Sequence, residues 1–275
     1  IVDNIIILFY HKILKVSIVI NYIGIFQAGG IKGIAHIGAV TALEERGFKC
    51  VKAAGTSVGA VIACLLIAGY SGKELKEIAL NLDLETLRQK GKLIQVFKDL
   101  GLYSPYPLEK YLDKLLQAKN IKTYQDIKRG NEYPLKVVAT DITRKKEIVF
   151  PDSLKEYYKN PDTFPISQSV VMSATYPLFY KPLRLNNNLI VDGAVVNNFP
   201  CNLFDSDNQL TIGFTFQNEK RKNKVSIPYL ISIELPKVRS MNFKVNKEMQ
   251  YQLFIAGYKA GKKFVESYFS SQLQS

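Results

Sequence analysis

Apolar and polar residues follow one another along this chain in blocks that predict strands, each followed by a helix. Residues 22–27 form a short apolar run, then come several glycines, and residues 34–46 have helical spacing and end at Gly47. A second run, at residues 50–54, leads through a turn that contains Ser57 into an apolar helix over residues 58–68. Strands that alternate with helices predict an α/β fold with a mostly parallel sheet.

The rest of the chain continues this pattern. Residues 71–128 are polar and amphipathic, are divided by Pro105 and Pro107, and predict helices on the outside of the fold. Further strands are expected at residues 135–141, 145–150, 189–194 and 210–216, and helices at residues 166–175 and 247–269. The last helix carries a stripe that predicts packing on the core, made of Leu253, Ala256, Ala260 and Phe264.

Residues 1–20 are interpreted as an N-terminal extension. Two apolar runs, at residues 5–10 and 16–20, are interrupted by His11, Lys12 and Lys15. Neither run approaches the ~20 apolar residues that cross a bilayer, and no basic segment precedes an apolar core as in a secretory signal. We expect the extension to be an extra strand or helix packed on the body, or alternatively an interfacial anchor.

Composition limits the possible binding partners of the protein and the cellular compartment in which it works. Lys and Arg number 37 against 24 Asp and Glu, a net charge of +13, which indicates an anionic partner such as acidic lipid headgroups or nucleic acid. The three cysteines, Cys50, Cys64 and Cys201, favour free thiols in a reducing, cytoplasmic compartment over a disulfide framework. With two histidines and no cysteine pair at ligand spacing, neither a metal site nor another cofactor is expected.

The glycine-rich turn A-G-G-I-K-G at residues 28–33 separates the first strand from its helix. A turn of this kind aims backbone N–H groups at an anion. It could instead be a tight packing turn or a dinucleotide phosphate loop. Against the phosphate loop, Ala28 stands where G-x-G-x-x-G begins, and residues 50–52 lack the acidic residue that should follow about 20 positions later.

The segment G-T-S-V-G at residues 55–59 places Ser57 on a tight strand-to-helix turn, at the positive end of a helix. This position suits a nucleophile, although an ordinary turn is the alternative. Of the possible bases, His11 lies in the extension, and His36 lies where a packing role is favoured. Asp192 ends a strand at a glycine turn and is the better base, provided that desolvation raises its pKa from ~3.9. An ordinary turn aspartate is again the alternative.

Together these motifs resemble those of the patatin-like phospholipases from about residue 22 to residue 203. The glycine loop, the G-T-S-V-G turn and D-G-A at residues 192–194 carry the resemblance, with softer matches at residues 33–38, 139–141 and 196–200. The resemblance implies a three-layer α/β/α sandwich around a mostly parallel sheet. Residues 21–275 would then be a single patatin-like catalytic domain that hydrolyses phospholipids or lysophospholipids without calcium.

The resemblance also implies roles for particular residues. Ser57 would be the nucleophile and Asp192 its base. The oxyanion hole would come from the glycine loop, and glycines beside the dyad would support the turns, which gives as candidates Gly29, Gly30, Ile31, Lys32, Gly33, Gly55, Gly59 and Gly193. Ala28 departs from the glycine usual in the family, but alanine keeps its N–H and fits unless its φ is positive.

Two other functions remain open on the sequence. The chain could be a phosphate- or nucleotide-binding module that uses the glycine loop and Lys32, or a basic membrane-binding or nucleic-acid-binding protein with an inert dyad. Nucleic acid is disfavoured because no recognition motif is present. Basic clusters at residues 144–146 and 220–224 are candidates for a face that associates peripherally with anionic membranes, and solvated loops are their alternative. The sequence leaves the oligomeric state open.

Overall fold

The computed structural model describes residues 19–82, 89–90, 101–204, 209–217, 227–240 and 245–273. Nearly all of the expected N-terminal extension, including His11, lies outside the described residues. The basic cluster at residues 220–224 lies outside them as well. The described part of the chain contains the glycine loop, Ser57 and Asp192, so the candidate site can be examined.

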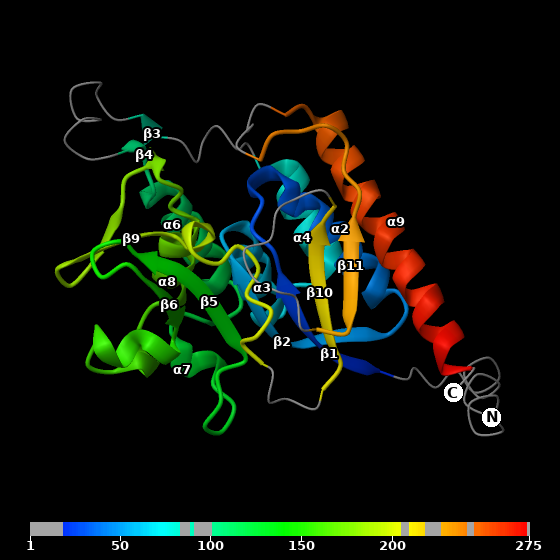
Figure 1. The fold of residues 1–275 in the computed structure, drawn as a ribbon, viewed down its shortest axis with the longest axis horizontal. Coiled ribbons are helices and arrows are strands. Elements are labelled where there is room, and N and C mark those ends of the chain that lie inside the picture. The colour runs from blue at the N-terminus through cyan, green and yellow to red at the C-terminus, as the bar shows by residue number, and fades with distance from the viewer. Residues whose placement is uncertain are drawn as a thin grey trace.

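An eight-stranded sheet forms the centre of the fold (Figure 1). Its parallel part has, in spatial order, β11 (Tyr229–Ile233), β10 (Thr211–Phe216), β1 (Ile20–Phe26), β2 (Phe48–Thr56) and β5 (Leu135–Asp141). The remaining strands pair antiparallel beyond β5 and are β6 (Lys146–Phe150), β9 (Asn188–Asp192) and β8 (Leu183–Leu185). The predicted α/β class with a mostly parallel sheet is therefore confirmed.

The expected helices are present, with ends shifted by a few residues. The α-helices are α2 (Gly33–Glu44), α3 (Val58–Ile67), α4 (Gly72–Asn81), α6 (Tyr106–Gln117), α7 (Tyr124–Ile127), α8 (Ile166–Ala174) and α9 (Lys247–Gln272). Short 3₁₀ turns complete the set: η1 (Gly30–Lys32), η2 (Asp152–Glu156), η3 (Pro161–Thr163) and η4 (Gly193–Val195).

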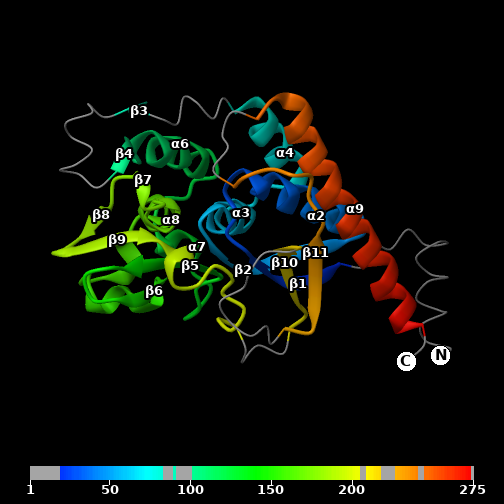
Figure 2. The same cartoon turned by 45° about the horizontal axis from the view of Figure 1, so that its top comes forward.

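A second, three-stranded sheet lies beside α6 and α8 (Figure 2). It consists of β3 (Gln89–Lys90), β4 (Gly101–Ser104) and β7 (Leu178–Tyr180). The sequence pattern predicted only helices over residues 71–128 and so missed β3 and β4. These strands are two to four residues long, too short for an alternating pattern to stand out.

The two faces of the main sheet are covered differently. On β1, Tyr22 and Phe26 point into the large core that α2, α3, α8 and α9 complete. Ile23 and Ile25 point to the opposite face, where coil residues form a smaller cluster with them: Phe199, Cys201, Phe204 and Ile227. Alternation along a strand explains this division. Within the described residues, coil rather than helix covers that second face of β1.

Glycines allow α9 to lie directly against α2 (Figure 2). A Cβ on Gly38 of α2 would lie 2.0 Å from the carbonyl oxygen of Phe254, and one on Gly257 of α9 would lie 1.7 Å from that of Ala35. The predicted packing of this helix on the core is thus present. The buried stripe, however, consists of Gln250, Leu253, Phe254, Gly257, Gly261 and Val265, because glycines mark the closest approach.

Replacing Gly257 by alanine is expected to lower the free energy of unfolding by about 1–3 kcal/mol, the usual cost of overpacking. Helix propensity alone would add about 1 kcal/mol of stability, so the close contact with Ala35 decides the sign. Urea denaturation measures the change, and Lys259→Ala, at an exposed position of the same helix, is the control. An unchanged or higher midpoint for Gly257→Ala would contradict the packing described.

Candidate active site

Ser57 stands alone between the end of β2 and the start of α3. Its backbone has φ 57° and ψ −125°, a conformation that costs a non-glycine residue about 1–3 kcal/mol. The turn is held from outside, because the Ser57 N–H donates to Ser173 Oγ at 2.8 Å and the Thr56 hydroxyl donates to the Asn197 carbonyl at 2.9 Å. A strained turn of this type projects the serine hydroxyl away from the chain.

The glycines predicted to support the turns lie where backbone segments pass very close together. A Cβ on Gly55 would lie 2.3 Å from the carbonyl group of Gly59, and a Cβ on Gly59 would lie 2.3 Å from the Phe26 carbonyl oxygen. A Cβ on Gly193 would lie 2.2 Å from the Val138 carbonyl oxygen. All three positions therefore require glycine for packing, which is a physical reason for the spacing of the two motifs.

Asp192 ends β9, and its carboxylate meets the Ser57 hydroxyl. Both residues line one cavity, and Ser57 acts on the carboxyl as a hydrogen-bond donor that lowers its pKa. The Ala194 N–H donates to Asp192 Oδ1 at 2.8 Å. The Asp192 backbone is fixed as well, because its N–H donates to the Thr175 carbonyl and its carbonyl accepts from the Thr140 hydroxyl, both at 2.9 Å. The structure thus brings together the two residues that the sequence paired.

Burial changes the acidity of Asp192. The side chain is 1% exposed, and desolvation raises the pKa of its carboxyl from 3.8 to about 6, against the hydrogen bonds from Ser57 and Ala194, which lower it. A carboxylate with a pKa near 6 is still ionised at neutral pH and is a much stronger base than an exposed aspartate. The condition that the sequence analysis set for Asp192 is met.

The hydrogen bond and the ring contacts of His36 go to residues other than this pair. It is fully buried, its Nε2 donates to the Gln27 carbonyl at 3.0 Å, and its ring stacks on Phe216 at 4.4 Å between centroids. Burial lowers the pKa of His36 to about 4, so it stays neutral. The packing role expected for His36 agrees with these contacts.

The glycine loop leaves two backbone donors uncommitted among the described residues. The N–H groups of Ile31 and Lys32 donate to the carbonyls of Ser240 and Gly29, at 3.0 and 3.2 Å, and the Gly33 N–H donates within η1. The N–H groups of Gly29 and Gly30 donate to no acceptor in the described part of the chain. The φ of Ala28 is not positive, and its N–H donates to the Asn198 carbonyl at 2.9 Å.

A cavity of about 440 Å³ opens beside Ser57 and Asp192. Gly29, Gly30, Ile31 and Gly33 also line it, whereas Lys32 does not. Beyond the dyad its wall is mostly apolar, and α2 contributes Ile34 and Ile37. The largest share comes from one face each of α3, α4 with the residue after it, and α6: Val58, Val61, Ile62, Leu65, Leu75, Ile78, Ala79, Leu82, Leu108, Tyr111, Leu112 and Leu115. Their spacing of three and four residues places each set on one side of its helix.

Comparison with known proteins identifies the family. The family model described as patatin-like phospholipase matches residues 24–205. The chain belongs to the patatin-like phospholipase family. The uncharacterized protein YqhO of Bacillus subtilis (strain 168) is 38% identical over 213 residues, 72% of each chain. The probable lipid hydrolase 463L of Invertebrate iridescent virus 6 is 29% identical over 205 residues, 73% of this chain and 66% of that protein.

Solved structures agree on the fold. VipD from Legionella pneumophila superposes with a TM-score of 0.61 at 18% identity, over 90% of this chain and 67% of VipD. Such a likeness concerns the arrangement of helices and strands rather than a substrate. By family, this chain is a patatin-like lipid hydrolase.

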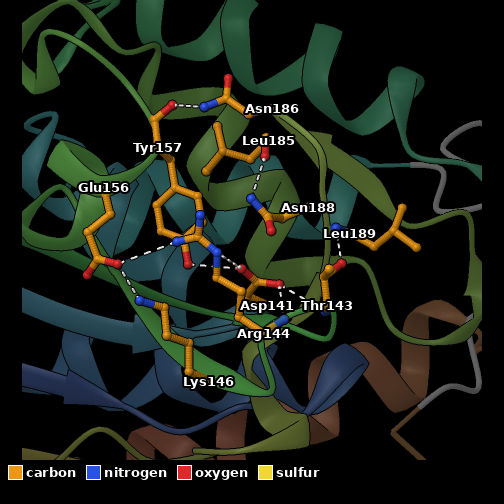
Figure 3. Close-up of polar contacts among 10 residues, drawn as sticks. All are labelled: Asp141, Thr143, Arg144, Lys146, Glu156, Tyr157, Leu185, Asn186, Asn188 and Leu189. Atoms are coloured by element: carbon orange, nitrogen blue, oxygen red, sulfur yellow. Dashed lines mark hydrogen bonds and ion pairs between the residues drawn. The ribbon is translucent and has the colours of Figure 1, made fainter.

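One basic cluster of this patatin-like chain is partly neutralised (Figure 3). Arg144 and Lys146 both pair with Glu156. Buried Asp141 accepts hydrogen bonds from the N–H groups of Thr143 and Arg144 and from the Tyr157 hydroxyl, at 2.9 Å each. The contacts fix the turn between β5 and β6, so Arg144 and Lys146 contribute less positive charge to a membrane-facing surface than their sequence suggested.

Several features of this patatin-like site were missed from the sequence. Ser173 and Thr175, which hold Ser57 and Asp192, lie in the predicted helix at residues 166–175 but carry no signal of their own. The walls contributed by α4 and α6 did have a signal, the amphipathic spacing in residues 71–128. That spacing could not distinguish a face that packs on the core from a face that lines a cavity.

Proposed function

We propose that this protein is a serine acyl hydrolase that cleaves carboxylic esters of phospholipids or lysophospholipids. The observation that carries the proposal is that Ser57, on its strained turn, and the buried Asp192 carboxyl line the same end of an apolar cavity, where Ser57 acts on that carboxyl as a hydrogen-bond donor and burial raises its pKa. Nucleophile and base within hydrogen-bond reach are the minimum for acyl transfer. We further propose that residues 21–275 act as one catalytic domain, since the cavity is lined by residues from 28 to 240.

In the proposed reaction, Asp192 takes the proton from the Ser57 hydroxyl as Oγ attacks the ester carbonyl carbon. The carbonyl oxygen becomes an oxyanion, which the N–H groups of Gly29 and Gly30 stabilise. The intermediate collapses with loss of the alcohol, which receives the proton from Asp192, and leaves an acyl-serine. Asp192 then takes a proton from a water molecule as its oxygen attacks the acyl carbon. When the acyl–Ser57 bond breaks, Asp192 returns that proton to the Ser57 oxygen, and the fatty acid leaves with the serine hydroxyl and the carboxylate restored. Each step uses groups of this chain and needs no calcium.

The cavity supplies a reason for choosing lipid esters. An acyl chain laid along α3 from Ser57 toward Leu65 would contact apolar side chains on α4 and α6 throughout. Burial of each methylene contributes about 0.8 kcal/mol, so a long chain binds this site better than a short one. A nucleotide would instead place polar groups against this apolar wall, and Lys32 lies outside it. The phosphate-binding alternative is therefore the weaker proposal.

A lipid substrate would require the enzyme to work at a membrane surface. Within the described residues, no helix is both long and apolar enough to span a bilayer. We propose peripheral association with an anionic membrane in the cytoplasm, supported by the net charge of +13.

Covalent labelling tests the proposed function directly. A fluorophosphonate probe is expected to modify the intact protein once, at Ser57, and peptide mass spectrometry locates the adduct. Ser57→Ala is the control and should remain unlabelled. Product analysis on mixed lipid vesicles then identifies the ester that is cleaved. Absence of labelling at Ser57 in correctly folded protein would favour a binding protein with an inert dyad.

The labelling rate should depend on pH in a defined direction. Because Asp192 acts only as the carboxylate and its pKa is raised to about 6, the rate should rise with pH through about 6 and level off above it. Asp192→Asn should show no such rise. A labelling rate that rises near pH 4 instead would mean that the carboxyl acting as the base is exposed rather than buried.

A further inference from the structure

Exposed apolar side chains gather on the elements that surround the cavity mouth. Tyr176, which is 46% exposed, lines the cavity itself, and Leu178, two residues later, is 77% exposed. Val195 is exposed in η4, next to Ala194 of the cavity wall. These two segments meet at the dyad, because the Asp192 N–H donates to the carbonyl of Thr175. The exposed residues therefore stand next to the catalytic pair rather than on a remote surface.

The small sheet extends this surface. β7, which begins at Leu178, pairs in parallel with β4, so that Leu178 aligns with Gly101. The next residue of β4, Leu102, is exposed, and Tyr106 at the start of α6 is 61% exposed. We call Leu102, Tyr106, Tyr176, Leu178 and Val195 the apolar rim. Helix α6 then continues directly into the cavity wall.

Leu178 is held in a costly backbone conformation. Its φ is 67°, a region that a bulky residue other than glycine rarely adopts. Its side chain is mostly exposed to water, so packing within this chain does not compensate for the backbone strain. Strained residues and exposed apolar patches both concentrate where a protein contacts something else. A glycine would suit the backbone here, so the leucine side chain is the part that calls for an explanation.

Exposed cations flank the same mouth. Lys237 and Arg239 are exposed and lead to Ser240, which lines the cavity and whose carbonyl accepts the Ile31 N–H. Glu234 is the exposed acidic residue of this segment, so the charge beside the mouth is net positive. Apolar side chains with tyrosine hydroxyls and cations at their edge match the layers of an anionic bilayer surface.

We propose that the apolar rim inserts into the interfacial layer of an anionic lipid bilayer, with Lys237 and Arg239 against the headgroups. The proposal rests on the proposed function and deepens it: the cavity would open onto the lipid, so that an acyl chain passes from the bilayer to Ser57 without crossing water. A cavity mouth beside the contact surface gives a bilayer lipid access to Ser57, whereas a protein partner would have no use for it. We therefore infer that the rim contacts a bilayer.

Vesicle flotation tests the rim without any turnover. The chain of residues 1–275 carrying Ser57→Ala is mixed with phosphatidylcholine vesicles, with and without phosphatidylglycerol, and the bound fraction is measured. Adding Leu178→Asp is expected to weaken binding by about tenfold or more, the effect of losing one buried leucine. Leu273→Asp, at a 44% exposed position at the end of α9, is the matched control and should bind as the parent does.

Two further variants separate binding from folding and charge. Leu178→Gly relieves the backbone strain, so it should unfold at the same or a higher temperature and yet bind vesicles as weakly as Leu178→Asp. Lys237→Glu with Arg239→Glu should weaken binding about fivefold per residue, on phosphatidylglycerol vesicles and at low salt.

The outcomes distinguish this inference from the proposed function. Vesicle binding that is equal in the parent, Leu178→Asp and Leu178→Gly would overturn the rim, as would a parent that binds neither kind of vesicle. A pull-down that depends on Leu178 while vesicles are ignored would assign the rim to a protein partner instead and would also overturn the proposal. Fluorophosphonate labelling of Ser57 in the unsubstituted chain reports the chemistry separately, so either idea can fail alone.

Discussion

Replacing Asp192 by asparagine is expected to lower kcat for ester hydrolysis by about 10³–10⁴-fold, the contribution of a positioned base to a serine nucleophile. Asparagine has nearly the same shape, and its Oδ1 can still accept the Ala194 N–H, but it cannot take the Ser57 proton. Hydrolysis of a monomeric chromogenic ester measures the loss. Because the dyad acts as a unit, Ser57→Ala with Asp192→Asn should cost little more than Ser57→Ala alone.

The same substitution is expected to stabilise the fold at neutral pH. The pKa of Asp192 is raised from 3.8 to about 6, so the native state holds this proton more tightly than the unfolded chain. Its contribution to stability therefore falls as pH rises from about 4 to about 6 and stays low above that. Asparagine never ionises, so Asp192→Asn should gain up to about 3 kcal/mol above pH 6 and almost nothing near pH 4.

Thermal unfolding of both proteins across this pH range checks the stability change. Burial lowers the pKa of His36 to about 4, which weakens the fold as pH falls from about 6.5. That effect is common to both proteins and cancels in their difference.

If Asp192→Asn hydrolysed esters as fast as the unsubstituted chain, Asp192 would not be the base. An equal stability difference at pH 4 and pH 8 would contradict the raised pKa.

Replacing Gly30 by alanine is expected to reduce kcat/KM by about 10²–10³-fold, the usual cost of losing an oxyanion donor. Gly30 has φ 55°, and a Cβ there would lie 2.2 Å from the carbonyl oxygen of Ser240. Since that carbonyl also accepts the Ile31 N–H, the loop would have to shift. The N–H groups of Gly29 and Gly30 would then no longer aim at the reacting carbonyl.

Gly69→Ala is the matched control for this substitution. Gly69 has a positive φ as well, 92°, but nothing lies within 4 Å of the added Cβ. Alanine at either position adds backbone strain of about 1–2 kcal/mol, and only Gly30→Ala disturbs the loop. Gly69→Ala should therefore keep its activity. The rise of the rate near pH 6 should survive in Gly30→Ala because Asp192 is untouched. Full activity in Gly30→Ala would remove the glycine loop from the mechanism.

The sequence alone determined the local structures on which the site depends. Strand, glycine loop and helix from residue 22 to residue 46, and strand, serine turn and helix from residue 50 to residue 68, follow from apolar periodicity and from glycines at turns. These signals lie within a few residues of each other, so they survive without any knowledge of the fold. Asp192 could be nominated for the same reason, as an acidic residue between a strand and a glycine turn.

Only the tertiary structure decided what those local pieces do to one another. The pKa of Asp192 depends on burial and on a serine 135 positions earlier in the chain, and the donors left in the glycine loop depend on a carbonyl at Ser240. The amphipathic faces of α4 and α6 become cavity walls because β2, α3 and η4 hold the dyad beneath them. Such properties come from packing between distant segments, which no window of sequence contains.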